Sequence, residues 1–119
     1  MRLYQELARA SSLRYEPLLA EAETYHAVAL LAAGRPRDAR AAVVSAIVRL
    51  RDVDLDAHGT QLAWSLVQLG RILVDLGSKQ DASAPLQEAL DIYRRLPSPR
   101  SKRDSDAMAK AQNLLSPFG

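Results

Sequence analysis

The sequence matches itself when it is shifted by 43 residues, with small residues falling on small residues and large apolar residues on large apolar ones. A fixed internal period of about 20–50 residues is typical of stacked structural repeats, in which each unit buries its apolar face against its neighbours. The match therefore predicts a repeat array rather than a single irregular core. The aligned pairs are Ala20 with Ala63, Ala27 with Gly70, Leu30 with Leu73, Gly34 with Gly77, Ala39 with Ala82, Val43 with Leu86, Ala46 with Ala89, and Ile47 with Leu90.

Within each unit the apolar residues follow helical spacing. In the second unit Leu66, Leu69, Ile72, Leu73 and Leu76 recur three or four residues apart, as on one face of an amphipathic helix. Gly77 is predicted to end that helix, and Ser78 with Asp81 resembles a capping box that opens the next one. Pro97 is expected to end the second helix, and Pro85 either bends it or delays its regular part to about Ser83.

The first unit repeats this plan, with helices predicted over about 17–33 and 36–51 and Gly34 as the turn. Alanine and leucine dominate the composition, and aromatic residues make up only 5% of the chain. Because alanine and leucine are strong helix formers, we expect an all-α fold with helix for more than about 70% of residues. No stretch is apolar enough to form a transmembrane helix, and the chain has no cysteine.

Residues 69–90, LGRILVDLGSKQDASAPLQEAL, resemble a tetratricopeptide repeat in their Leu-Gly pairs and in the spacing of the alanines and leucines that follow. Residues 27–47 match the pattern less fully, because His26-Ala27 stands where Leu-Gly is expected. The 43-residue period is similar to that of the longer repeats of kinesin light chains and of many bacterial regulatory proteins.

The resemblance implies antiparallel helical hairpins stacked as a short right-handed superhelix, in one domain over residues 1–119. It further implies about six helices. The expected parts are an N-terminal capping helix over 1–12, repeats over 17–52 and 60–96, a basic linker over 97–104, and a C-terminal capping helix over 105–116 whose register is offset by 46 residues from Ala63.

The sequence offers little for catalysis or metal binding. His26 is expected to be packed on the apolar face of the first repeat helix, and His58 to be solvated in a turn. Asp52, Asp54 and Asp56 alternate, but Ala57 and Ala63 stand where an EF-hand loop needs glycine and glutamate. Asp54, Asp56 and His58 are interpreted as solubilising and helix-capping residues rather than as ligands of a transition metal. We therefore expect no enzyme activity, no cofactor and no metal.

Residues 94–103 hold five basic residues and no acidic one, while the net charge of the whole chain is only +2. Such a segment can attract phosphates, but it lacks the interleaved aromatic residues that stack on bases. A solvated connector is the favoured interpretation. Association with nucleic acid through this segment stays open as one alternative function, and a ligand-binding or enzymatic pocket near His26 stays open as another.

The family resemblance implies a concave groove that is lined by the first helix of each unit and holds a peptide or a partner protein. Carried over position by position, it places these residues in the groove: Glu21, Thr24, Val28, Leu31, Trp64, Val67, Arg71, Val74, Asp75, Lys110 and Asn113. Family members that clamp a carboxylate place lysine and asparagine where this chain has Thr24, Val28, Val67 and Arg71, which argues against a chaperone's acidic tail as the ligand.

Trp64 and Val67 are predicted to be an exposed apolar anchor, with Arg71 meeting a carboxylate or a backbone carbonyl of the partner. On that interpretation Trp64→Ala weakens binding and leaves the helices intact. The leading hypothesis is thus a cytoplasmic protein-interaction module of a bacterial regulatory or assembly system. Apolar residues in both terminal helices also predict self-association.

Overall fold

The computed structural model describes residues 2–52, 55–96 and 101–116, and within them the chain consists of five α-helices without a strand. The helices are α1 (Arg2–Ala32), α2 (Pro36–Arg51), α3 (Leu55–Asp75), α4 (Lys79–Arg95) and α5 (Lys102–Leu115). These bounds confirm the all-α prediction and the expected helical fraction. The predicted bounds of the helix over 36–51 are also confirmed.

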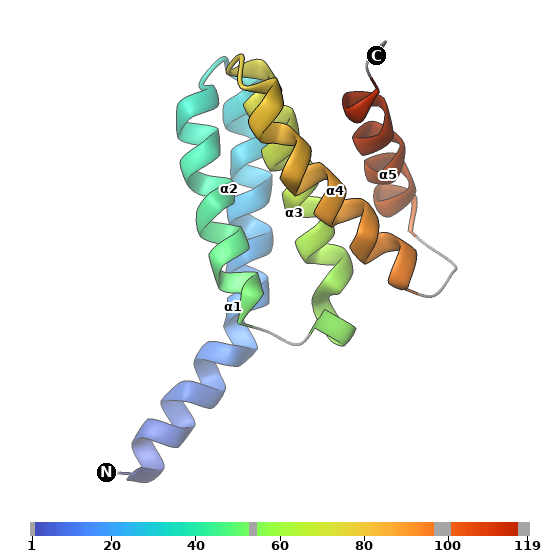
Figure 1. Cartoon of the computed structure of the whole chain (residues 1–119). Coiled ribbons are helices and arrows are strands. Elements are labelled where there is room, and N and C mark those ends of the chain that lie inside the picture. The colour runs from blue at the N-terminus through green and yellow to red at the C-terminus, as the bar shows by residue number, and fades with distance from the viewer. Residues whose placement is uncertain (1, 53–54, 97–100, 117–119) are drawn as a thin grey trace.

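The helices form two antiparallel hairpins, α1 with α2 and α3 with α4, and α5 packs against the second hairpin (Figure 1). The elements pack in chain order: α3 contacts α1 and α2 on one side and α4 and α5 on the other. No Cα atom of α2 lies within 8 Å of one in α4. The helices therefore pack in a row, each against its neighbours, rather than as a closed bundle.

Both hairpins turn in the same way, as the 43-residue repeat predicts. Gly34 and Gly77 adopt positive φ angles of 76° and 81°, which glycine tolerates because it has no Cβ. The amide of Arg35 donates to the carbonyl of Leu30 at 2.9 Å, and the amide of Ser78 donates to that of Leu73 at 2.8 Å. Each turn is a Schellman motif, which satisfies carbonyls that the helix end leaves without partners.

The repeat also recurs in the core. Six of the aligned pairs are buried in both units, and they include the alanines at the helix contacts. Small side chains let the two backbones of a hairpin approach closely, and larger residues fill the space beside them. At Gly70 an added Cβ would collide with Cγ and Cδ2 of Leu86, so α3 and α4 lie in contact there without room for a side chain.

The N-terminal helix differs from the prediction. Residues 2–12 are helical, but they do not form a separate capping helix, because α1 runs without a break from Arg2 to Ala32 through Pro17. Over the described ranges, five helices therefore replace the expected six. Proline removes one helical hydrogen bond, yet the helix continues through it here. Pro17 is buried, and its carbonyl oxygen accepts a hydrogen bond from the Gln61 amide of α3.

The remaining boundaries bring three further corrections. Ser78 is the N-cap of α4 but makes no side-chain capping bond, so the predicted capping box is wrong. The helix α4 begins at Lys79 and continues through Pro85, so the delayed start near Ser83 is wrong as well. In α5 the buried alanines are Ala107 and Ala111, whereas Ala109, which the offset of 46 residues aligns with buried Ala63, is exposed, so that offset is also wrong.

The start of α5 is fixed by polar contacts. The hydroxyl oxygen of Ser101 accepts a hydrogen bond from the amide of Asp104 at 3.1 Å, which caps the helix. The Asp104 side chain is buried and accepts a hydrogen bond from the Tyr93 hydroxyl of α4 at 3.3 Å. The predicted linker over 97–104 is thus too long, because α5 already begins at Lys102. Residues 97–100 of that linker lie outside the described part of the chain.

One ion pair joins α2 to α4. The Arg51 guanidinium donates two hydrogen bonds to the Glu88 carboxylate, at 2.7 and 2.9 Å. These hydrogen bonds lower the pKa of Glu88 below its ordinary value of 4.5. A carboxylate whose pKa is lowered in the folded state adds stability above its unfolded pKa, and that contribution is lost as the pH falls through the folded pKa.

We therefore expect the free energy of unfolding of the wild-type chain to fall more steeply below about pH 4.5 than that of Glu88→Gln. Both side chains are more than a third exposed, so the difference should stay under about 1 kcal/mol. Urea unfolding at a series of pH values measures it. Parallel pH profiles for the two proteins would show that this pair contributes nothing.

Candidate partner-binding cleft

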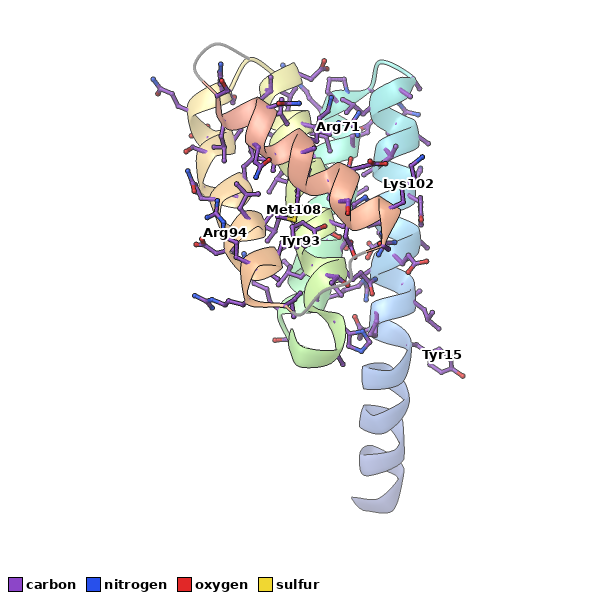
Figure 2. All side chains as sticks on the ribbon, turned by 90° about the vertical axis from the view of Figure 1, so that its right-hand side faces the viewer. Tyr15, Arg71, Tyr93, Arg94, Lys102 and Met108 are labelled. Carbon is purple, nitrogen blue, oxygen red and sulfur yellow. The ribbon has the colours of Figure 1, made fainter. Side chains whose placement is uncertain are left out.

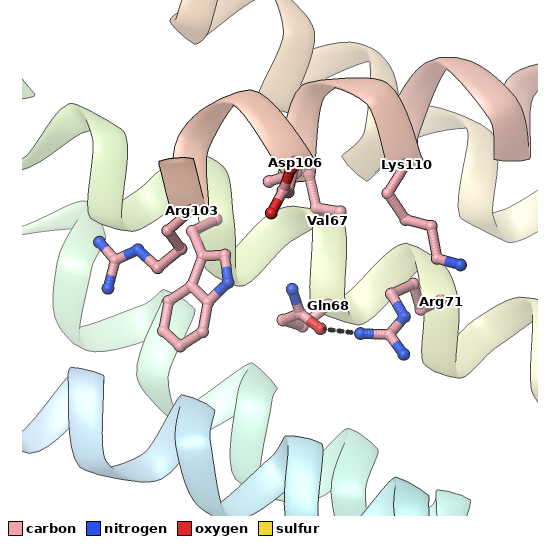
Figure 3. A pocket seen from close by; sticks show the side chains of 8 residues that line it. Val67, Gln68, Arg71, Arg103, Asp106 and Lys110 are labelled. Carbon is pink, nitrogen blue, oxygen red and sulfur yellow. Dashed lines mark hydrogen bonds between the residues drawn. The ribbon is translucent and has the colours of Figure 1, made fainter. Parts of the chain in front are cut away.

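A cleft of about 370 Å³ lies between α3 and α5 (Figure 3). We call it the α3–α5 cleft. Each helix contributes four residues at positions i, i+3, i+4 and i+7, the spacing that brings side chains to one helical face. The lining residues are Trp64, Val67, Gln68 and Arg71 from α3, and Arg103, Asp106, Ala107 and Lys110 from α5.

Trp64 forms the inner end of the cleft and joins three helices. Its ring lies 4.7 Å from the ring of Tyr25 on α1, with the planes tilted by 56°. The guanidinium carbon of Arg103 on α5 lies over the indole ring, 4.4 Å from its centroid, within the range of a cation–π interaction. Trp64 is only 6% exposed and Val67 is fully buried, so the predicted exposed apolar anchor is wrong at both residues. The ring is a packed part of the cleft wall.

Arg71 stands at the opposite end of the cleft. One of its guanidinium nitrogens donates to the side-chain oxygen of Gln68 at 2.8 Å (Figure 3). Gln68 is 5% exposed, so the hydrogen bond holds the half-buried arginine in a fixed position on α3. The partner is a neutral amide and leaves the positive charge of Arg71 uncompensated.

The charges that line the cleft are predominantly positive. Arg71, Arg103 and Lys110 face a single carboxylate, that of Asp106. Within residues 2–52, 55–96 and 101–116, neither Arg71 nor Lys110 forms an ion pair, and Arg103 approaches only Asp104, at 4.0 Å. Clefts with low-dielectric walls concentrate the field of such charges and attract ions of opposite sign. An anionic group is therefore the chemical complement of this cleft.

A second cleft of about 290 Å³ lies between α2, α3 and α4 and differs in its charge balance. Its two arginines, Arg51 and Arg95, are matched by the carboxylates of Glu88 and Asp91. The bidentate pair of Arg51 with Glu88 occupies part of it. This cleft has no net charge to offer a ligand.

The structure brings together four of the residues predicted for a groove, namely Trp64, Val67, Arg71 and Lys110. Thr24 is fully buried, so its placement in the groove is wrong. Its hydroxyl donates to the Ala20 carbonyl and lies 2.9 Å from the Ser65 hydroxyl oxygen, between α1 and α3. Six more predicted residues lie outside the lining of the α3–α5 cleft: Glu21, Val28, Leu31, Val74, Asp75 and Asn113.

Sequence reasoning missed the other half of the lining. Gln68, Asp106 and Ala107 carry no motif, although their helical spacing from Trp64, Val67 and Lys110 was available as a signal. Arg103 was assigned to the basic linker. It opens α5 instead and stacks on Trp64. The basic segment is thereby divided, because Arg94 and Arg95 end α4 while Lys102 and Arg103 begin α5.

His26 is exposed on α1 and lines neither cleft, so its predicted packing on the apolar face is wrong. The adjacent Ala27 occupies the buried position instead. No group of three or more potential ligands gathers around a metal position in the described ranges, and Asp54 lies outside them. None of the described helices combines the length and apolar character needed to cross a membrane.

Comparison with known proteins adds no relative from which a role could be inferred. No family model, no curated protein sequence and no solved structure significantly matches this chain.

Proposed function

We propose that this chain is a non-catalytic protein-interaction module that holds an acidic segment of a partner protein in the α3–α5 cleft. The observation that carries the proposal is the excess of positive charge in this cleft, where Arg71 and Lys110 form no ion pair in the described ranges and Asp106 is the one carboxylate among the lining residues. A partner that supplies carboxylates completes ion pairs which the folded chain lacks on its own.

The proposed architecture is a short tetratricopeptide-like array. Its support is the 43-residue repeat, the two identical glycine turns, and the packing of each hairpin on the next helix. In such an array the first helix of each unit lines the concave face, a role that falls here to α1, α3 and α5. The cleft lies between two of these three helices, and Tyr25 of the third contacts its Trp64 wall.

The lining also defines the chemistry of the proposed ligand. Arg71 retains guanidinium donors beyond the one that Gln68 accepts, and a planar fork of this kind suits a carboxylate. Lys110 adds a second positive charge from the opposite wall, and the wall between them is closed by the buried side chains of Val67 and Ala107. An acidic segment therefore fits better than a basic or a purely apolar one.

A binding experiment with charge-reversed variants tests the proposal. The probe is a fluorescently labelled ten-residue peptide in which glutamates alternate with alanine and leucine, measured by anisotropy against the full chain. We expect Arg71→Glu and Lys110→Glu each to weaken binding about tenfold or more, equal to about 1.4 kcal/mol. Both side chains reach solvent, so the fold should survive.

Arg40→Glu is the matched control, because it changes the net charge equally at an exposed position on α2 outside both clefts. It should leave the dissociation constant within about twofold, since distant surface charges are screened by salt. A peptide with lysine in place of glutamate should not bind. Equal weakening by all three variants, or no binding of the acidic peptide to the wild-type chain, would contradict the proposal.

A further inference from the structure

The outward face of α1 carries an exposed apolar stripe. Tyr15, Leu18, Ala22, Tyr25 and Ala29 follow one another at intervals of three and four residues, so they share one side of the helix. Tyr15 is 54% exposed, Leu18 64% and Tyr25 51%. The stripe contains no charged residue. In the sequence the same spacing continues back through Ser11 and Leu7 to Tyr4.

The first half of α1 lies apart from the other helices. Figure 1 shows it extending beyond the end of α2, and Figure 2 shows Tyr15 projecting from α1 away from the bundle. An isolated helix of about 12–15 residues is only marginally stable in water, and most helical stability in proteins comes from packing of an apolar face. A contiguous exposed apolar surface of this kind marks an interaction site.

We infer that two copies of this chain pair through α1, antiparallel, across a two-fold axis near residue 17. The helix covers residues 2–32, so this centre lays residues 2–14 of one copy along residues 20–32 of the other. A two-fold interface uses the same surface on both subunits. Each copy then covers the stripe of its partner, and each supports the helical segment that its partner leaves unpacked.

The charges of the two halves of α1 favour this pairing. Residues 2–14 contain three arginines and one glutamate, whereas residues 20–32 contain two glutamates and neither lysine nor arginine. An antiparallel pair sets the basic half against the acidic half. A parallel pair would set like charges against each other, which costs free energy and suppresses that orientation.

Arg49 of α2 reduces the charge repulsion that two Glu16 carboxylates would cause near the axis. Its guanidinium bridges Glu16 at 2.9 Å and Glu23 at 2.6 Å within one copy. The two Glu16 side chains of a dimer lie near the axis, and each already has its own counter-charge. Glu21 has no ion pair in the described part of the chain, and its negative charge is available to the basic half of the partner.

The surface area that a stable dimer must bury is consistent with an interface that uses the whole length of α1. Tyr15, Leu18, Leu19 and Tyr25 are about half exposed and offer roughly 100 Å² each, or about 800 Å² for two copies. Specific, stable interfaces bury at least about 1,200 Å² in total. The pairing therefore needs the whole of α1, which explains why the helix extends beyond its own bundle.

The oligomeric state of the full chain, measured by light scattering and sedimentation at micromolar concentrations, tests the inference. We expect a dimer for the wild type. Leu18→Glu places two like charges beside the axis and should raise the dissociation constant about 100-fold or more. Val48→Glu is the matched control, because Val48 is 60% exposed and belongs to α2 rather than to the stripe on α1. It should remain a dimer.

The orientation of the pair is tested with the same protein. The chain has no cysteine, so His26→Cys, at an exposed position outside the stripe, carries a single spin label. Residue 26 lies nine residues from the proposed axis, so the two labels should be about 27 Å apart in an antiparallel pair and about 10 Å apart in a parallel one. The inference would be overturned if the wild type is monomeric, if Leu18→Glu leaves the dissociation constant of the dimer unchanged, or if the two labels lie about 10 Å apart.

Discussion

Trp64→Ala is expected to lower the free energy of unfolding by about 3–5 kcal/mol, a large share of the total stability of a domain of this size. The indole is 6% exposed and contacts the Tyr25 ring and the Arg103 guanidinium. Its removal leaves a cavity where α1, α3 and α5 meet and takes away the stacking partner of Arg103. Urea unfolding followed by circular dichroism measures the loss.

His26→Ala provides the comparison. His26 lies on α1 one position after Tyr25, and its side chain is exposed. A surface substitution of this kind should change the free energy of unfolding by no more than about 0.5 kcal/mol. If Trp64→Ala proves as stable as His26→Ala, Trp64 is a free anchor after all, and its packed position in the cleft wall is wrong.

The second large effect concerns the contact between α3 and α4. Gly70→Ala should cost about 1–3 kcal/mol, because the new Cβ meets the buried side chain of Leu86. The equivalent positions of the first unit hold Ala27 and Val43, a larger residue paired with a smaller one. Glycine with leucine and alanine with valine are thus two solutions to the same packing problem.

The double variant Gly70→Ala, Leu86→Val recreates the combination of the first unit. Leu86→Val alone should cost about 1 kcal/mol for the lost methylene group. The valine makes room for the alanine. The double variant should therefore lose less free energy of unfolding than the two single variants lose together, by about 1 kcal/mol or more. Additive losses would mean that Gly70 is not a site of close approach.

The fold was largely predictable because its determinants are local. Pro36 starts α2, and Gly34 and Gly77 end the helices that precede them. These helix ends depend only on the backbone conformation that proline or glycine adopts, so they can be read from the sequence. The 43-residue match then identified the buried positions in both units. The continuity of α1 through Pro17 was not predictable, because the surroundings of Pro17 are tertiary: it is buried, and its carbonyl accepts a hydrogen bond from Gln61, 44 residues away.

The site was predicted only in part, because it depends on how helices cross. The repeat register placed Val67 and Arg71 on the side where the cleft forms, and Lys110 also lines it although the offset used to place α5 is wrong. It could not show that Tyr25 and Arg103 cover Trp64, since these contacts join α3 to two other helices. Thr24 likewise occupies the expected face of α1, but the approach of α3 encloses it against Ser65.

The central claim, that an acidic segment binds in the α3–α5 cleft, is tested most directly by titrating the glutamate peptide into isotopically labelled protein and recording NMR spectra. Trp64 is the only tryptophan, so its indole N–H gives a single signal from the inner end of the cleft. The account predicts that this signal and the amides of Gln68, Arg71 and Lys110 shift together and saturate at one peptide per chain. Shifts confined to the cleft around Arg51 and Glu88, or no shift at the indole, would contradict it.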